Sequence, residues 1–262
     1  MKKLFAAVMA FSIGFCGLCA ADEAFDIARK NDECDASTKT VYSAKMTLTN
    51  KSGSARVREF SYKLKNFGDT DKSVFVFSKP QDVAGTALLS FSYQAKSDGT
   101  KQDDDTWLYM PAMKKVRRIS GSGKDEDFMG SDFTYDDIGD RGVYKDDFKL
   151  LGEEAVDGVD CYKLEAAAKA ANAKYPRHIY WIRKDNFFTQ KSETYDKKGA
   201  LKRVMTVPES SVVDGFFTQT KLLMEDVQTK HSTLIEITNV NHTEDVDDNI
   251  FTVATLERGN LR

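Results

Sequence analysis

The chain has 262 residues, of which 41% are hydrophobic and 30% carry a charged side chain. Its 38 Lys and Arg and 41 Asp and Glu give a formal net charge of −3, which argues against a nucleic-acid partner. The length suits one large all-β domain or two small ones. Because no Pro-, Gly- or Ser-rich linker divides the sequence, we expect a single domain over residues 22–262.

Residues 1–21 have the pattern of a secretory signal peptide. Two lysines come first, an apolar core follows over residues 4–15, and a small-residue cleavage site ends at Ala21. The apolar core is shorter than the ~20 residues that a helix needs to span a bilayer. We therefore expect export to the periplasm and removal of the signal, which leaves 36 basic residues against 41 acidic ones and a net charge of −5.

The four cysteines leave two questions open. Cys16 or Cys19 could be the lipidated first residue of a bacterial lipoprotein, but the residues before them are too large for such a site, so soluble export is the preferred interpretation. Cys34 and Cys161 remain after cleavage. In an exported protein they either form a disulfide or stay as two separate buried thiols.

The pattern after the signal changes from a short helix to strands. Residues 21–36 predict a short amphipathic helix. Residues 42–48 and 60–64 alternate apolar with polar side chains, which is typical of half-buried strands, and the turn 50–54 joins them. The run 74–77 is apolar on both faces and is therefore expected in the middle of the sheet.

The same alternation continues almost to the end of the chain. Turns such as Asp157-Gly158 separate consecutive strands. The segments that predict further strands are 87–93, two within 105–119, then 144–155, 159–167, 179–183, 187–195, 201–207, 215–226 and 233–240. No strand-helix-strand unit occurs, so we expect one antiparallel succession of ten or more strands with very little helix. Residues 245–261 predict either a short helix or an edge strand.

The block at residues 105–141 carries the most specific pattern in the chain. The segment W-x-Y-M-P-A-x-K-K-x-R-R-I at 107–119 precedes G-S-D-F-T-Y-D-D at 130–137. On these residues the chain resembles the outer-membrane lipoprotein-sorting protein family, the LolA-like periplasmic carriers, and specifically their longer branch. Weaker similarity extends over most of the mature chain, for example at 161–165 and 195–199.

The resemblance implies a mainly β fold, in which one strongly curved antiparallel sheet forms a half-open barrel with a few short helices or loops as a lid. It also implies a carrier that shields acyl chains of a lipoprotein or another lipid in a hydrophobic cavity, without a cofactor. An inner-membrane transporter of the ABC or RND type and an outer-membrane acceptor are the implied partners. The alternative is a non-enzymatic binding or sensor module, or an accessory subunit of an RND-type export complex.

Side-chain parity indicates which residues line such a cavity. Apolar rows on successive strands should point to the concave side, because the convex side of a curved sheet meets water. The predicted ligand-binding residues are Phe60, Tyr62, Leu64, Leu89, Phe91, Tyr93, Trp107 and Tyr109. Phe128, Met129 and Phe133 are predicted to close the mouth of the cavity.

A basic cluster lies on the second strand that the block at 105–119 predicts. Lys114, Lys115, Arg117 and Arg118 lie beside aromatic residues and precede an acidic loop. The cluster is either a docking patch for anionic lipid headgroups or an acidic partner, or a solvent-facing strand paired with the carboxylates at 125–127.

No set of side chains in the sequence indicates catalysis. His178, His231 and His242 lie in separate segments without cysteine or carboxylate ligands at metal-binding spacing. The acidic runs lack the spacing of a calcium loop, and the Gly-Ser-Gly-Lys at 121–124 lacks the rest of a phosphate-binding loop. We therefore predict a protein that is not an enzyme and has no metal or cofactor.

Overall fold

The structure, a computed structural model, describes residues 16–35, 37–94, 101–139 and 141–259 of the chain, with side chains from residue 22 onward. Residues 1–15 of the predicted signal peptide lie outside these residues, whereas the predicted cleavage site at Ala21 lies within them. Helix α1 (Cys16–Asp32) begins within the last part of the predicted signal and continues through the predicted N-terminal helix. None of the helices in the described ranges is both long and apolar enough to cross a membrane.

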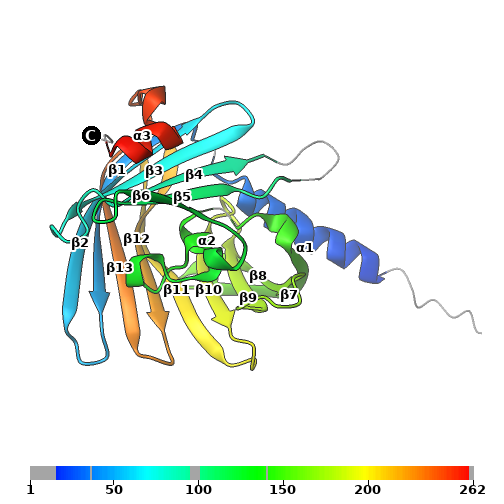
Figure 1. The fold of residues 1–262 in the computed structure, drawn as a ribbon. Coiled ribbons are helices and arrows are strands. Elements are labelled where there is room, and N and C mark those ends of the chain that lie inside the picture. Colours follow the sequence, from blue (N-terminus) through cyan, green and yellow to red (C-terminus); the bar gives the residue numbers. More distant parts are fainter. Residues whose placement is uncertain (1–15, 36, 95–100, 140, 260–262) are drawn as a thin grey trace, which may run out of the picture.

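The described residues form one antiparallel sheet of thirteen strands (Figure 1). The strands are β1 (Lys39–Thr49), β2 (Ala55–Asn66), β3 (Thr70–Lys79), β4 (Ala87–Tyr93), β5 (Asp105–Met110), β6 (Lys115–Ile119), β7 (Asp146–Val156), β8 (Val159–Ala168), β9 (Arg177–Arg183), β10 (Thr189–Tyr195), β11 (Leu201–Val213), β12 (Phe216–Asp226) and β13 (His231–Asn241). The predicted antiparallel succession with little helix is confirmed.

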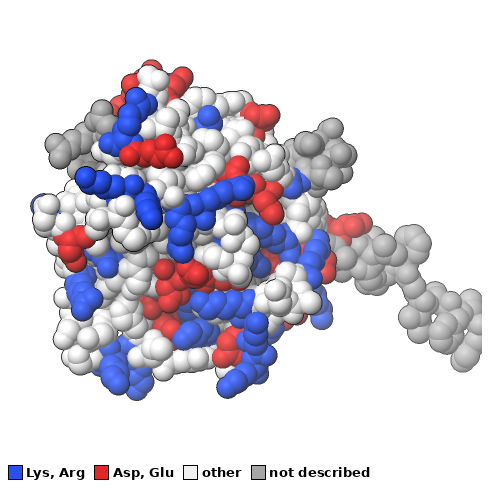
Figure 2. All heavy atoms as spheres, in the orientation of Figure 1, with Lys and Arg blue, Asp and Glu red and all other residues white. Residues whose placement is uncertain are grey.

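The sheet is curved and open. Its strand order is β6-β5-β4-β3-β2-β1-β13-β12-β11-β10-β9-β8-β7, so hairpins join most neighbours and β1 pairs with β13. Strands β6 and β7 follow each other in the sequence but are the two edges of the sheet. Figure 1 shows the sheet curling around the short helix α2 (Tyr135–Ile138), and Figure 2 shows basic side chains as a band along β6. The predicted half-open barrel is therefore confirmed.

Apolar clusters cover both faces of the first half of the sheet. On the concave face, Phe60, Phe75 and Leu88 pack against aromatic residues from the segment between β6 and β7. On the convex face, Leu89 packs against Phe251 and other residues of the C-terminal segment, which contains η4 (Asp248–Ile250) and α3 (Val253–Arg258). Residues 245–261 therefore contain a helix and no strand within the described part.

The predicted cavity rows are wrong for the residues on β4 and β5. The register pairs Tyr62 with Phe75 and Phe75 with Leu88, so the concave row continues through Leu88 and then Leu108. The residues that point to the convex side instead are Leu89, Phe91, Trp107 and Tyr109, which lie in the convex cluster, and Tyr93, which shares their side of β4. Because the C-terminal segment covers the convex face, that face is apolar too, and polarity alone does not identify the inner side.

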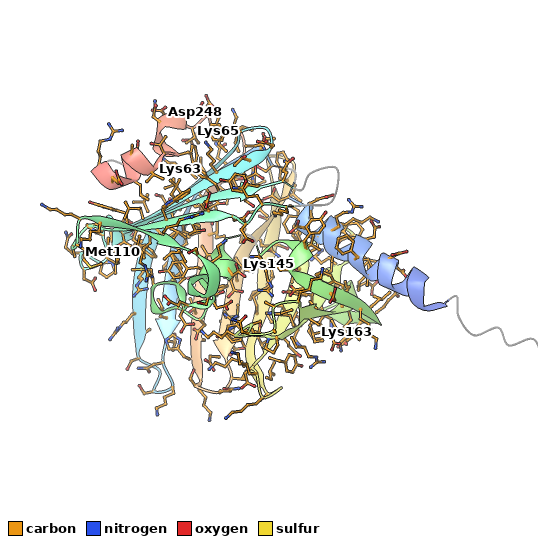
Figure 3. All side chains as sticks on the ribbon, turned by 45° about the vertical axis from the view of Figure 1, so that its right-hand side comes forward. Lys63, Lys65, Met110, Lys145, Lys163 and Asp248 are labelled. Atoms are coloured by element: carbon orange, nitrogen blue, oxygen red, sulfur yellow. The ribbon has the colours of Figure 1, made fainter. Side chains whose placement is uncertain are left out.

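Polar contacts hold the C-terminal segment on β2. Lys65 Nζ lies 2.7 Å from Asp248 Oδ1, and it also donates to the carbonyl oxygen of Val246 at 3.0 Å. Figure 3 shows Lys63, Lys65 and Asp248 together on this outer side of the sheet. The contacts explain why a short C-terminal helix stays on the convex face.

The second half of the sheet has its own cover. On α1, Ala24, Ile27 and Ala28 are buried against Leu164 of β8 and Ile182 of β9. The helix therefore closes part of the concave side next to the β7 edge. Cys161 is buried in a convex cluster with Trp181, and both Cys34 and Cys161 are free thiols, so the disulfide interpretation is wrong.

Candidate functional site

Residues 121–138, the plug, fill the middle of the concave side. They contain η1 (Gly121–Asp125), η2 (Phe128–Gly130) and α2. Phe128 is fully buried, and its ring centroid lies 6.0 Å from that of Phe75 and 5.7 Å from that of Phe77. Tyr135 packs on the other side of Phe128 with a centroid distance of 5.5 Å.

The predicted role of the aromatic run is therefore wrong in part. Phe128 and Phe133 do not close a mouth, because both are buried in the concave core and Met129 packs beside them. The sheet curls far enough to enclose the connection between β6 and β7, and the aromatic residues of that connection bury the concave apolar face. The chain itself therefore fills this part of the concave side.

The G-S-D-F-T-Y-D-D motif shapes the plug. Met129 and Gly130 adopt positive φ angles of 52° and 71°, which reverse the chain after Phe128. Thr134 then caps α2: its hydroxyl accepts from the amide of Asp137 at 3.1 Å, while Asp137 Oδ2 accepts from the amide of Thr134 at 2.7 Å. The two turns present the polar side of the plug to β11 and β13.

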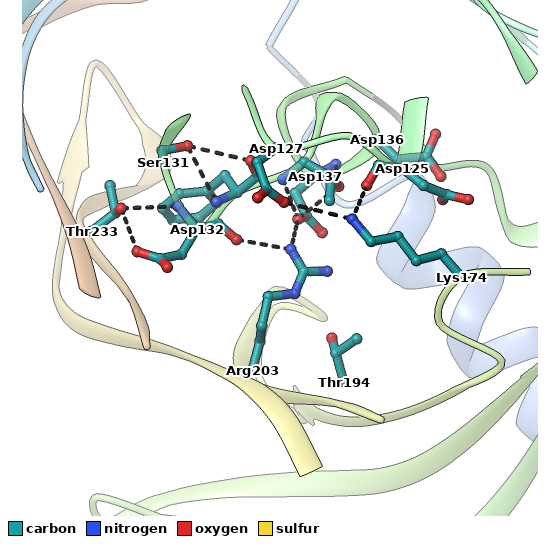
Figure 4. A network of polar contacts seen from close by, with 12 residues as sticks. Asp125, Asp127, Ser131, Asp132, Asp136, Asp137, Lys174, Thr194, Arg203 and Thr233 are labelled. Atoms are coloured by element: carbon teal, nitrogen blue, oxygen red, sulfur yellow. Dashed lines mark hydrogen bonds and ion pairs between the residues drawn. The ribbon is translucent and has the colours of Figure 1, made fainter. Parts of the chain in front are cut away.

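Arg203 of β11 is the central tether of the plug (Figure 4). Its side chain is 3% exposed. One nitrogen, Nη1, donates to the carbonyl oxygen of Asp132 at 2.8 Å and to Asp137 Oδ2 at 2.7 Å. A single buried guanidinium thus holds both turns of the motif.

Strand β13 provides a second tether. Asp132 Oδ2 accepts a hydrogen bond from the Thr233 hydroxyl at 2.7 Å and lies 2.6 Å from His231 Nδ1. The amide of Asp132 donates to the same hydroxyl at 3.0 Å. Asp132 and Thr233 are both buried, so these bonds are shielded from water.

Further contacts reach the plug from its periphery. Arg58 of β2 donates to the carbonyl oxygen of Met129. Lys174, in the connection after β8, donates to the carbonyl oxygen of Asp125 at 2.9 Å, and Arg117 of β6 lies 3.6 Å from Glu126. The plug is therefore bound by polar groups on several sides of the hollow.

The charge environment keeps Asp137 ionised. Burial acts to raise the pKa of Asp137, but Arg203 and the hydrogen bonds from Thr134 outweigh it, so the pKa lies below the ordinary value of 3.8. The carboxylate is therefore charged at neutral pH and pairs with the guanidinium of Arg203.

Three spaces surround α2 on the concave side, and Asp136 borders all of them. The first, of about 300 Å³, lies against β2 to β5, and the second, of about 350 Å³, lies between α1 and β9. The third, the seam hollow, has about 550 Å³ and lies between β6 and the connection after β8. These volumes fall in the range of roughly 300–1,000 Å³ that is typical of ligand sites.

The walls of these spaces combine apolar and polar groups. Three of the predicted cavity residues line the space against β2 to β5, namely Tyr62, Leu64 and, from β4, Phe91, together with Ile138 of the plug. Phe60, the third predicted residue of β2, is buried beneath the plug. Burial raises the pKa of the Tyr62 hydroxyl, which is therefore neutral and can donate a hydrogen bond.

The described residues contain no group of three His, Cys, Asp or Glu side chains that could hold a metal ion. Among the described residues, Ser37 Oγ lies 3.0 Å from His242 Nδ1, and His242 Nε2 lies 3.0 Å from the Thr218 hydroxyl. The ring is therefore held between hydroxyl groups, whereas a Ser-His-Asp triad needs a carboxylate to orient it.

His178 of β9 is buried on the concave face, and its Nε2 has no hydrogen-bond partner among the described residues. Burial, helped by the nearby Arg141, lowers the pKa of His178 from 6.5 to about 4, although Asp146 and Asp137 oppose the shift. The native state therefore keeps the imidazole neutral. In the unfolded state it takes up a proton below about pH 6.5.

Stability should consequently fall as the pH is lowered from about 6.5 toward 4. For this residue alone we expect a loss of about 2 kcal/mol in the free energy of unfolding between pH 7 and pH 5. Urea unfolding of the protein and of a His178→Gln variant at both values measures the effect. The variant should lose less stability than the parent, and equal losses would show that His178 is not the source.

Comparison with known proteins identifies a matching family model and several similar crystal structures. A family model described as an uncharacterized protein matches residues 69–258. The crystal structure of a DUF1329 family protein from Desulfovibrio piger is 34% identical with a TM-score of 0.82, and the match covers 90% of this chain and 99% of that one. No curated protein matches the chain significantly.

Two further crystal structures are similar. A protein domain from Vibrio parahaemolyticus, named for outer membrane lipoprotein sorting, is 31% identical with a TM-score of 0.81, and the match covers 91% of this chain and all of that one (100%). A LolA superfamily protein from Nitrosomonas europaea is 20% identical with a TM-score of 0.66, over 88% of this chain and 98% of that one. The last likeness shows a shared fold.

Proposed function

The chain belongs to the DUF1329 family of LolA-like proteins, and on this premise we propose that it is a carrier that shields the acyl chains of a lipoprotein or another lipid in the bacterial periplasm. The observation that carries the proposal is the concave side of the sheet. There, a tethered segment of the chain covers an apolar face of the sheet. The spaces of about 300 and 350 Å³ beside that segment have apolar side chains such as Leu64 and Ile182 in their walls, whereas the seam hollow of about 550 Å³ is lined mainly by charged and polar residues.

The plug occupies the position that an acyl chain takes in this proposal. Its aromatic side chains lie on Phe75 and Phe77 in the same way that hydrocarbon would. Unlike the strands, the plug is joined to the sheet mainly through side chains, so it can move away without breaking the ladder of backbone hydrogen bonds. Cargo binding then exchanges one apolar contact for another.

This exchange makes binding reversible. A chain of sixteen carbons gains roughly 12 kcal/mol from complete burial at ~0.8 kcal/mol per CH₂, and a bilayer offers about the same. Displacing the plug and its tethers costs part of that gain. In such a carrier, the donor and the acceptor of the lipid determine the direction of transfer. The proposed donor is an inner-membrane transporter of the ABC or RND type, and the proposed acceptor lies in the outer membrane.

The test of the proposal is direct detection of cargo. The protein is purified from a bacterial periplasm without detergent, and bound lipid is extracted and identified by mass spectrometry. Titration with a fluorescent fatty acid then measures occupancy of the hollow. Copurified lipid together with saturable probe binding supports a carrier, whereas a folded protein with neither favours the alternative of a binding or sensor module.

A matched pair of serines distinguishes the two faces of the sheet. Ser73 lines the space against β2 to β5, whereas Ser61, on the neighbouring strand, pairs with Val76 and points to the convex side. We expect Ser73→Trp to weaken binding of the fluorescent fatty acid at least tenfold, because the indole occupies the space, and Ser61→Trp to leave it unchanged. Overpacking costs about 1–3 kcal/mol of stability, so circular dichroism of both variants is measured alongside. Equal affinities would place the cargo elsewhere.

A further inference from the structure

The edge strand β6 carries an exposed band of positive charge. Lys114, Lys115, Arg117 and Arg118 are all exposed, and Figure 2 shows the band of basic side chains along this edge. Arg117 and Arg118 have carboxylate partners in Glu126 and Asp105. No described residue forms an ion pair with Lys114 or Lys115, so the four cations face only two carboxylates in a chain whose net charge is −3.

The other edge of the sheet is different. The exposed carboxylates of β7 have lysine partners: Asp147 lies 3.6 Å from Lys169 and Glu154 lies 2.7 Å from Lys163. Glu153 is likewise paired with Lys184. Charged residues on an edge strand discourage pairing with another chain, and either sign serves that purpose. Edge protection therefore accounts for charge on both edges but not for the uncompensated charge on β6 alone.

The geometry of β6 suits a flat partner. Lys115 and Arg117 share the concave side with their partners Met110 and Leu108, whereas Arg118 lies on the convex side with Trp107. Cations on both sides of one edge can reach a common plane beyond that edge. Next to them, in the turn before β6, the apolar side chain of Met113 is 53% exposed.

The band also borders an entrance to the concave side. Arg118 lines the seam hollow, whose wall carries both cations, such as Lys124 and Lys169, and carboxylates, such as Asp125 and Asp136. A surface that binds β6 would therefore face the 550 Å³ space that leads toward the plug. The edge is only five residues long, and its charges hinder strand addition, so an acidic peptide is a poorer match than a lipid surface.

From these observations we propose that the β6 edge, with Met113 and Lys114 to Arg118, docks on the surface of an anionic phospholipid bilayer and turns the seam hollow toward it. Lysine and arginine near such a surface are attracted by the lipid phosphates, and an exposed apolar side chain can enter the headgroup region. The inference extends the proposed carrier function by naming the membrane as a partner, but it rests on charge and exposure that are independent of cargo binding.

The experiment is vesicle flotation of the purified protein. Vesicles contain either phosphatidylcholine alone or phosphatidylcholine mixed with phosphatidylglycerol. We expect binding to the mixed vesicles only, weakened by salt because exposed charges are screened. The Lys114→Glu/Lys115→Glu variant should bind at least about 25-fold more weakly, from roughly fivefold for each lysine removed, because the added carboxylates are also repelled by the lipid phosphates. Lys197→Glu/Lys198→Glu, which changes two exposed lysines in the turn between β10 and β11 by the same charge, should bind as the parent does.

Two readouts separate this inference from the carrier proposal. Absence of binding to the mixed vesicles, or an equal loss in both double variants, would overturn the docking surface. Uptake of the fluorescent fatty acid in solution should be the same in the Lys114→Glu/Lys115→Glu variant as in the parent. If the parent binds mixed vesicles but takes up no fatty acid, docking stands and the carrier function fails.

Discussion

Replacing Arg203 with methionine is expected to lower the free energy of unfolding by about 3 kcal/mol. The change leaves the Asp137 carboxylate and the carbonyl oxygen of Asp132 without the donor that now lies 2.7 and 2.8 Å away. Breaking a buried ion pair by removing one partner costs roughly 3–5 kcal/mol, and the lower end applies because 29% of the Asp137 side chain remains exposed. Chemical denaturation at pH 7 measures the loss.

A second substitution identifies the cause. Adding Asp137→Asn to Arg203→Met removes the stranded charge, so the double variant should recover part of the lost stability. A loss below about 1 kcal/mol in the single variant would mean that the pair behaves like an exposed salt bridge and does not tether the plug.

The pH dependence of the same pair has a defined sign. The pKa of Asp137 is lower in the native protein than in the unfolded chain, so the stability it contributes is present above the unfolded value of about 3.8 and is lost as the pH falls through the native value. The Arg203→Met variant should lack most of this dependence in acid. Unfolding measured between pH 5 and pH 3 in parent and variant tests the expectation, and parallel curves would contradict it.

The sequence predicts the sheet well because the information is local. Alternation of apolar and polar residues, and turns such as Asp157-Gly158, define strands and hairpins without reference to distant residues. The resemblance to the LolA-like family predicted that the sheet is strongly curved and stays open. Neither source indicates that β1 pairs with β13, since that contact closes the meander between segments that are far apart in the chain.

The site was harder to predict because the alternation of side chains along a strand does not show which face of the sheet is concave. Leu89 and Trp107 belong to a genuine single-face row, but a C-terminal segment containing Phe251 buries that row on the convex side. The tethers were missed for a related reason. Arg203 lies in a strand with polar neighbours and gains its role only from the fold. The spacing of Thr134 and Asp137 does indicate a helix cap, and it is the one local signal that could have revealed how the plug is built.

Replacing Phe128 with alanine should have opposite effects on stability and on cargo binding. Phe128 is fully buried against Phe75 and Phe77, so the truncation leaves a cavity and is expected to cost about 3–5 kcal/mol. If the plug holds the place of an acyl chain, the same cavity becomes available to the fluorescent fatty acid. The affinity of the variant for this probe should then rise about tenfold or more, because less of the plug must be displaced.

Phe251→Ala is the matched control, since Phe251 is equally buried but lies on the convex face under the C-terminal segment. It should cost a similar amount of stability without any gain in affinity. Saturating probe should also raise the stability of Phe128→Ala, by about 2.7 kcal/mol at a hundred times the dissociation constant, because the ligand binds the native state alone. If both variants lose stability and neither binds the probe more tightly, Phe128 is ordinary core and the plug is a permanent part of the fold. Tighter binding by Phe128→Ala alone would instead show that the plug and the cargo compete for one apolar face.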